Sequence, residues 1–316
     1  MYLKLKKTLY GLKCSPRHFY KLARQILLSI GLTQHPMSPC IFWGTLVKGQ
    51  PPLYLGLYVD DFLYFSESPQ VEKTFEDRFG KEIDTDFYGQ IGCFLSINFD
   101  CTRHNASNVT IHLSQEAFID NLCEMAGLLS DAVNTVQTPY KSSYPVDSIS
   151  FTRLPQKEQD ELTHSMQVYV GCLTWLSIST CPDITTITNI LAKHTTKATP
   201  AHIDQVKQTI KYLKGTKTLG VSFSSNHQQK LESHVKFPIY DPVTGLCNAN
   251  WGPQDQSCPR SNEIRTTPLF TNHSLSGFLI YFSGPLHWVS KRQTVTACRS
   301  AKAEMHKMPS SVTLHY

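Results

Sequence analysis

The sequence predicts an α+β protein, and three observations carry that prediction. An amphipathic helical pattern lies near the N-terminus, apolar β-rich runs flank the pair Asp60-Asp61, and strand patterns return from about residue 238, after a mainly helical stretch. The length of 316 residues suggests two or three domains, and a hydrophobic content of 41% is enough for real cores.

The first predicted helix begins at Ser15, a good N-cap residue, has Pro16 at its first helical position and ends at Gly31. Its predicted core face holds six apolar residues: Phe19, Leu22, Ala23, Ile26, Leu27 and Ile30. The opposite face carries Arg17, Lys21 and Arg24. Because the first 24 residues include no acidic side chain, this face suits phosphates, and a basic face turned to water is the alternative.

The later elements follow from periodicity and turn residues. A second helix is predicted after Ser68-Pro69, with Val71, Phe75 and Phe79 on one side. Beyond it we predict strands at 94–99 and 109–112, joined by a turn at 105–108, and then a helix at 115–129. That helix has Phe118, Leu122, Met125 and Leu129 near one face. A linker at 141–159 is followed by helices at 166–178, 183–194 and 201–214, and by strands at 275–282 and 286–289. Thr199-Pro200 mark the start of the last helix and Gly215 its end.

The segment from Tyr54 to Phe65, Y-L-G-L-Y-V-D-D-F-L-Y-F, predicts a β-hairpin of two buried strands with Asp60 and Asp61 at or beside its turn. Two neighbouring carboxylates in a buried setting need a cation, and a divalent metal pair that clamps a phosphoryl-transfer reaction is such a partner. The alternative is ordinary turn chemistry, with both side chains in water.

An ordered series of motifs resembles the reverse transcriptase of copia-type (Ty1/copia) retrotransposon Pol polyproteins. The series reads L-Y-G-L-K-C-S-P-R-H-F-Y from Leu9, S-P-C-I-F from Ser38, Y-V-D-D from Tyr58, F-L-S-I from Phe94, L-S-Q from Leu113, T-P from Thr138, Y-V-G-C-L from Tyr169, C-P-D-I from Cys181 and Y-L-K-G-T from Tyr212. Its last part, S-G-F from Ser276 and W-V-S-K-R-Q from Trp288, resembles the start of that family's ribonuclease H region. Cys14 and Ser96 depart from the pattern, since they stand where the family has Gln and Gly.

The resemblance implies a reverse-transcriptase palm remnant with thumb-proximal elements at 1–140, helical thumb or connection elements at 141–240, and a partial ribonuclease H-like mixed sheet at 241–316, with a helix after Ser300. It also implies an RNA or DNA template-primer as partner and Mg²⁺ as cofactor. Asp60 and Asp61 match the polymerase metal ligands. The expected phosphate contacts are Lys13, Arg17, Lys21 and Arg24. A second set, Lys207, Lys211 and Lys214, either contacts the template as well or is simply exposed to solvent.

Two departures predict that this chain is catalytically silent. The family's third polymerase carboxylate precedes the L-Y-G-L-K segment, and the sequence begins only a few residues before that segment. In the ribonuclease H part, Asn248 and Asn250 stand where the family has aspartates and Lys302 where it has an acid, while Glu304 is retained.

Bulk composition narrows the class of protein further. Thirty basic and 25 acidic residues give a mild charge of +5, and ten cysteines show no C-x-x-C pair or zinc spacing. The absence of a secretory signal, and of the roughly 20 apolar residues that cross a bilayer, predicts an intracellular chain, cytoplasmic or nuclear. Three hypotheses remain: a polymerase whose third carboxylate comes from another chain or whose gene model is cut short, a non-catalytic nucleic-acid binder, and an element relic without biochemical role.

Overall fold

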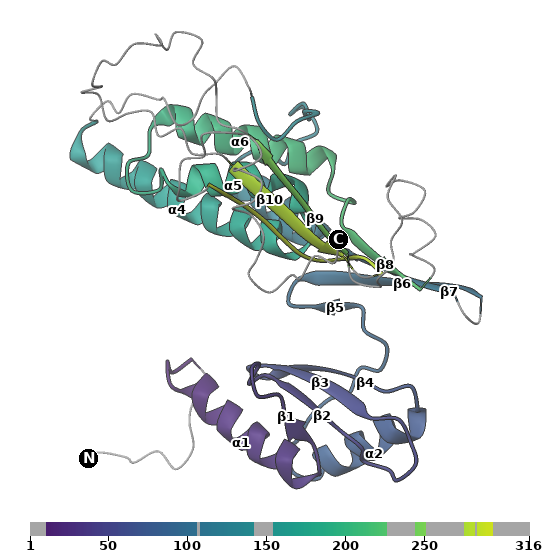
Figure 1. The fold of residues 1–316 in the computed structure, drawn as a ribbon. Helices are drawn as coiled ribbons and strands as arrows, with labels where there is room; N and C mark the ends of the chain where they lie inside the picture. Colours follow the sequence, from purple (N-terminus) through teal and green to yellow (C-terminus); the bar gives the residue numbers. More distant parts are fainter. Residues whose placement is uncertain are drawn as a thin grey trace, which may run out of the picture. The chain divides into compact units, whose positions relative to one another are not determined.

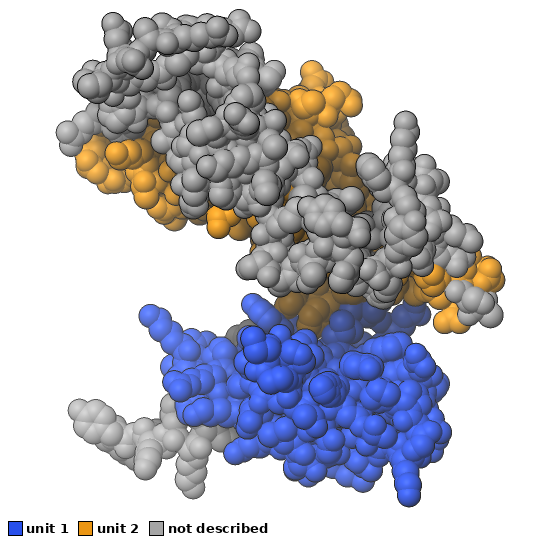
Figure 2. Space-filling model, viewed as in Figure 1, with its two compact units in different colours: residues 1–91 blue, residues 92–316 orange. Residues whose placement is uncertain are grey.

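The computed structural model describes residues 11–105, 108–141, 154–225, 244–250, 275–281 and 283–292. The chain divides into two compact units, residues 1–91 and 92–316 (Figure 2). Helices and antiparallel sheets occur in both units, so the α+β class predicted from the sequence is confirmed.

Unit 1 combines a four-stranded antiparallel sheet with two helices (Figure 1). Its elements are α1 (Ser15–Ser29), β1 (Thr33–Gln34), β2 (Ile41–Gly44), β3 (Leu53–Tyr58), β4 (Asp61–Phe65) and α2 (Pro69–Phe79), and the strands lie in the order β1-β2-β3-β4. The helices and one face of the sheet enclose the core, which includes Ala23, Ile26, Leu27, Phe42, Leu53, Leu55, Leu57, Val71, Phe75 and Phe79. The predicted core face of α2 is therefore confirmed.

The ends and the core face of α1 differ in part from the prediction. Cys14, not Ser15, takes the N-cap position and makes no side-chain cap hydrogen bond, whereas Gly31 ends the helix with φ +105°, as predicted. Leu22 was expected in the core and is 49% exposed. At 3.6 residues per turn it lies about 100° around the helix from Ala23, at the edge of the buried stripe.

The strands of unit 1 are buried on one face only, which corrects the expectation of fully buried runs. Along β3, buried leucines alternate with Tyr54 and Tyr58, and Tyr58 is 56% exposed. Phe65 at the end of β4 is exposed as well. Because the two helices of unit 1 pack on the leucine side, an antiparallel sheet of this kind leaves its second face open.

Unit 2 holds two antiparallel sheets and a helical core. Its elements are β5 (Cys93–Phe94), β6 (Ile97–Asn105), β7 (Asn108–Ser114), α3 (Glu116–Met125), α4 (Gln156–Ser179), the 3₁₀ helix η2 (Pro182–Ile184), α5 (Thr185–Ala192), α6 (Pro200–Gly215), β8 (Val221–Ser224), β9 (Thr244–Asn250), β10 (Leu275–Tyr281) and β11 (Pro285–Arg292). The strand orders are β5-β6-β7-β8 and β11-β10-β9. All described pairs of the second sheet are antiparallel, whereas a mixed sheet was predicted there.

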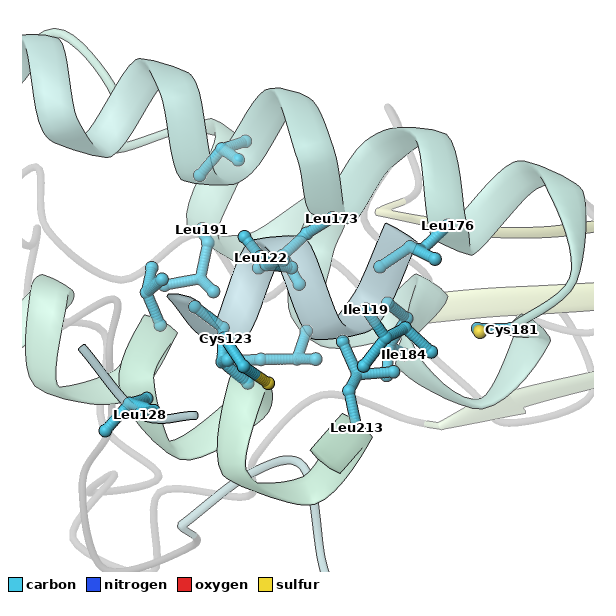
Figure 3. Close-up of a cluster of buried hydrophobic side chains, with 14 of the residues drawn as sticks. Ile119, Leu122, Cys123, Leu128, Leu173, Leu176, Cys181, Ile184, Leu191 and Leu213 are labelled. Carbon is cyan, nitrogen blue, oxygen red and sulfur yellow. The ribbon is translucent and has the colours of Figure 1, made fainter. Parts of the chain in front are cut away.

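Side chains of α3, α4, α5 and α6 meet in the core of unit 2 (Figure 3). Helix α3 ends at Met125, earlier than predicted, and Gly127 follows with φ +67°. Leu129 therefore lies beyond the helix, and both Met125 and Leu129 are exposed, contrary to the prediction. Ile119 and Cys123 take the core positions beside Leu122.

The unit boundary falls earlier in the chain than the domain border expected near residue 140. Strand β7 pairs with β6 on one side and with β8 on the other, and α3 packs against the helices that follow it. Residues 92–141 therefore pack with unit 2, while the family domain borders at 140 and 240 stay predictions. Helix α4 begins at Gln156, so the last four residues of the predicted linker are helical.

Two remaining expectations are only partly covered by the structure. The helix predicted after Ser300, with Glu304, lies outside the described residues. Among the residues that are described, no helix is both long and apolar enough to span a membrane.

Candidate functional site

The acidic pair lies at the tip of the β3–β4 hairpin, as predicted. Tyr58 pairs with Asp61, so Val59 and Asp60 alone connect the two strands. Phe62 and Tyr64 of β4 pack against the core, and alternation along the strand therefore places Asp61 on the open face of the sheet. The hairpin presents one carboxylate in its turn and one at the first position of β4.

The turn holds its shape at a conformational cost. Val59 has φ +56°, in the left-handed region that two-residue hairpin turns use and that β-branched residues avoid. A residue held there costs on the order of 1–3 kcal/mol and persists only where its surroundings hold it in place. This strain is not visible in the sequence, because Asn or Gly is the usual signal for such a turn and neither stands at position 59.

The inner side of β4 is fastened to α2. The Tyr64 hydroxyl donates to Glu76 Oε1 at 2.5 Å, and the Ser66 backbone N–H donates to Glu72 Oε1 at 3.1 Å. Burial, followed by the hydrogen bond to Glu76, raises the pKa of Tyr64. These bonds hold β4 on α2 while its outer face stays open.

The carboxylates themselves face water. Asp60 and Asp61 are exposed, and among the described residues no hydrogen bond or ion pair involves either carboxylate. Carboxylate oxygens are ligands that Mg²⁺ accepts, usually one or two of them with water completing the shell. The pair therefore fits one hydrated ion. Within the described part of the chain, no group of three His, Cys, Asp or Glu side chains gathers for a metal, and a two-metal clamp needs a larger set.

The predicted basic residues divide into two kinds. Lys13, Arg17 and Lys21 are exposed at the start of α1. Arg24 is half-buried, and its Nε donates to Gln34 Oε1 at 2.8 Å. Gln34 in turn donates to the Tyr20 hydroxyl at 2.8 Å, so Arg24 helps to tie α1 to β1.

The two asparagines of the ribonuclease H resemblance lie on one strand. Asn248 and Asn250 belong to β9, opposite Gly277 and Leu275 of β10. Both residues carry amides, which lack the negative charge of the aspartates that the resembling family has at these positions.

Comparisons with known proteins agree with the hairpin and its flanks. Residues 1–142 match the family described as "Reverse transcriptase (RNA-dependent DNA polymerase)". The chain is 26% identical over 305 residues to the "Retrovirus-related Pol polyprotein from transposon RE1" of Arabidopsis thaliana, covering 95% of this chain and 18% of that protein. It is 24% identical over 285 residues to a putative transposon Ty5-1 protein of Saccharomyces cerevisiae, covering 90% of this chain and 80% of that protein. No solved structure matches the chain.

Residues 1–142 are thus similar to a reverse transcriptase family. Over most of its length the chain is a relative of copia-type retrotransposon Pol polyproteins, which include those of RE1 and of TNT 1-94 from Nicotiana tabacum, 23% identical over 306 residues. It spans about a fifth of the length of those two polyproteins.

Proposed function

We propose that this chain is the part of a copia-type RNA-directed DNA polymerase that binds a template-primer and holds one Mg²⁺ at Asp60 and Asp61. The observation that carries the proposal is the β3–β4 turn, which presents two exposed carboxylates that no described residue pairs with. The family match over residues 1–142 supports the same assignment.

The roles of the residues follow from their positions. Asp60 and Asp61 supply oxygen ligands, and a bound Mg²⁺ supplies charge neutralisation for a phosphate or hydroxyl oxygen. Arg17 and Lys21 offer exposed cations to a nucleic-acid backbone, where such contacts bind without sequence preference. Arg24 shares that role only if it releases Gln34.

A metal titration tests the proposal on the full chain. We expect Mn²⁺, used as the probe for Mg²⁺, to bind with one site per chain, and the double substitution Asp60→Asn/Asp61→Asn to abolish that binding. The single change Asp61→Asn should weaken it roughly thirtyfold, because a carboxylate and a dication near 4 Å attract each other by about 2 kcal/mol in water, twice the figure for two unit charges. The matched control is Asp84→Asn/Asp86→Asn, which removes two exposed aspartates elsewhere in unit 1. Equal loss of Mn²⁺ binding in the control would contradict the site.

Primer extension separates the polymerase from the non-catalytic binder. With two described carboxylates in place of a two-metal set, we expect the chain alone to extend no primer above background with Mg²⁺ or Mn²⁺. The amides of β9 favour the same outcome for ribonuclease H activity. Extension that disappears in Asp60→Asn would show an active polymerase. Absence of both metal and nucleic-acid binding would favour an element relic without biochemical role.

A further inference from the structure

Strand β11 meets the helices of unit 2 through three polar contacts. The Trp288 indole Nε1–H donates to the Ser177 carbonyl at 2.5 Å. The Thr186 hydroxyl donates to Ser290 Oγ at 2.8 Å, and Asn189 Nδ2 donates to the Ser290 carbonyl at 2.6 Å. Trp288 and Ser290 are residues i and i+2 of the strand, so their side chains share one face of β11, and their hydrogen bonds turn this face to α4 and α5.

The indole contact lies at a helix end that needs a donor. Helix α4 ends at Ser179, so the Ser177 carbonyl is one of the last four and has no partner within the helix. Besides Trp288, it accepts from the Thr185 hydroxyl at 3.2 Å. The C-terminal carbonyls of a helix carry partial negative charge, which favours an N–H donor at this position. Trp288 therefore caps α4 from a strand more than a hundred residues away in the sequence.

The turn before β11 is seated on a second element. The Ser224 backbone N–H at the end of β8 donates to the Ser283 carbonyl at 2.8 Å. A Cβ atom added at Gly284 would lie 2.5 Å from both Phe223 Cδ1 and the Ser222 carbonyl. Only glycine fits so close to that backbone, so the β10–β11 turn has a defined place against β8.

Hydrogen bonds, more than a shared core, attach this sheet. The described core of unit 2 draws its buried and partly buried residues from α3 to α6, η2 and the loops among them, and it includes none of the described side chains of β10 and β11, at 277–280 and 285–291. Exposed hydrogen bonds contribute modestly because water competes for the same groups. Polar interfaces within one chain are the kind at which modules move relative to one another.

We propose that Trp288 and Ser290 form a docking motif by which the β9–β11 sheet attaches reversibly to a receptor site on α4 and α5. The receptor consists of the Ser177 carbonyl, Thr186 and Asn189. It recognises an extended strand that carries an indole N–H and, two residues later, a hydroxyl. Docking supplies a cap to α4, so release of the sheet also loosens the C-terminal turn of that helix. The proposal is independent of metal and nucleic-acid binding.

Hydrogen exchange on the full chain, read by mass spectrometry, tests this docking. The substitution Asn189→Asp replaces the amide donor with a carboxylate facing the Ser290 carbonyl. We expect amides of 275–281 and 285–292 to exchange at least tenfold faster, while those of α6 in the core stay unchanged. The matched control is Asn121→Asp, the same change at an exposed position of α3, which should leave the sheet protected.

Three further single variants and one double variant test the docking even if Asn189→Asp folds poorly. Thr186→Ala and Ser290→Ala remove opposite halves of one hydroxyl contact, so the double variant should exchange no faster than the faster single one. Trp288→Phe keeps the ring and removes only the donor, and it should speed exchange at both β11 and residues 176–179. The proposal is overturned if the sheet loses no more protection than in the control, or if α6 loses protection together with the sheet, since the sheet would then belong to one cooperative core.

Discussion

The motif residues of unit 1 and those of unit 2 differ in whether their side chains bond to other residues of the chain. In unit 1 the motif charges stand at the surface without partners among the described residues, as at Asp60, Asp61 and Arg17. In unit 2 the motif residues bond to one another, as where the Tyr212 hydroxyl donates to Asp183 Oδ2 at 2.6 Å. Motifs of one resemblance therefore leave charges open to a ligand in one unit and hold the fold together in the other. Substitutions should change ligand binding with little change in stability in unit 1, and the reverse in unit 2.

The largest effect is expected on nucleic-acid binding. Reversing two charges with Arg17→Glu/Lys21→Glu should weaken binding to a primer-template duplex by roughly a hundredfold at low salt and flatten the salt dependence by about two phosphate contacts. Stability should stay within about 0.5 kcal/mol, because both side chains are exposed. Fluorescence anisotropy across a salt series measures the first effect, and urea unfolding the second.

The control for this prediction makes the same charge change on the same unit. Lys73→Glu/Lys81→Glu reverses two exposed lysines, at α2 and just beyond it. If this control loses as much binding as the α1 variant, the net charge of the chain, and not the basic face of α1, determines nucleic-acid binding. Unchanged binding after Arg17→Glu/Lys21→Glu would count against the assigned face of α1.

The next effect is on the stability of unit 2. His202 is buried and closes a capping box at the start of α6: Thr199 Oγ1 accepts from its backbone N–H, and its Nδ1 accepts from the Thr199 backbone N–H at 3.1 Å. His202→Ala should cost roughly 2 kcal/mol, since it removes a buried ring and leaves the Thr199 N–H without that acceptor. His202→Gln should recover much of the loss, because Gln serves in the same box. Chemical denaturation compares the three proteins, and equal losses in both variants would argue that the ring, not the cap, matters.

Short sequence patterns predicted the turn of the β3–β4 hairpin and the ends of α6 correctly. The turn at Asp60 follows from apolar runs on either side of it, and the ends of α6 follow from Thr199-Pro200 and Gly215. What the sequence could not supply depends on partners far along the chain. Which residue at the edge of an apolar stripe is covered depends on the neighbouring element, and Leu22 was misplaced for that reason.

Contacts between distant residues were equally out of reach. Arg24 looks like one more cation of the basic stripe until Gln34 takes up its Nε–H. In the sequence, Trp288 stands out only as part of a segment that resembles ribonuclease H, because its bond to the Ser177 carbonyl depends on how β11 lies against α4. Periodicity assigns a face to a side chain, but it does not identify the group that the side chain meets.

A smaller effect is expected from pH. Burial, and then the hydrogen bond to Asp183, raises the pKa of Tyr212 to about 12, while an unfolded tyrosine ionises near 10. The unfolded chain therefore loses this proton first, so the stabilisation is present below pH 10 and is lost as the pH rises toward about 12. Tyr212→Phe should cost about 1 kcal/mol at neutral pH and should flatten the alkaline decline. Urea unfolding on both sides of pH 10 measures it, with the exposed Tyr88→Phe as control; parallel declines in all three proteins would remove Tyr212 as the cause.

The smallest effect concerns the β5–β6 turn, the counterpart in unit 2 of the Val59–Asp60 turn. Phe94 pairs with Ile97, and Leu95 and Ser96 between them have φ of +52° and +62°, as a type I′ turn requires. The resembling family has glycine at the position of Ser96, and glycine adopts such angles without strain. Ser96→Gly should therefore raise the free energy of unfolding by about 0.5–1 kcal/mol. Ser68→Gly, at a residue with φ −112°, has no such strain to relieve and should lower stability slightly. If Ser96→Gly and Ser68→Gly shift the urea midpoint in the same direction, the entropy of the unfolded chain determines both changes in stability. The left-handed turn then contributes no measurable strain.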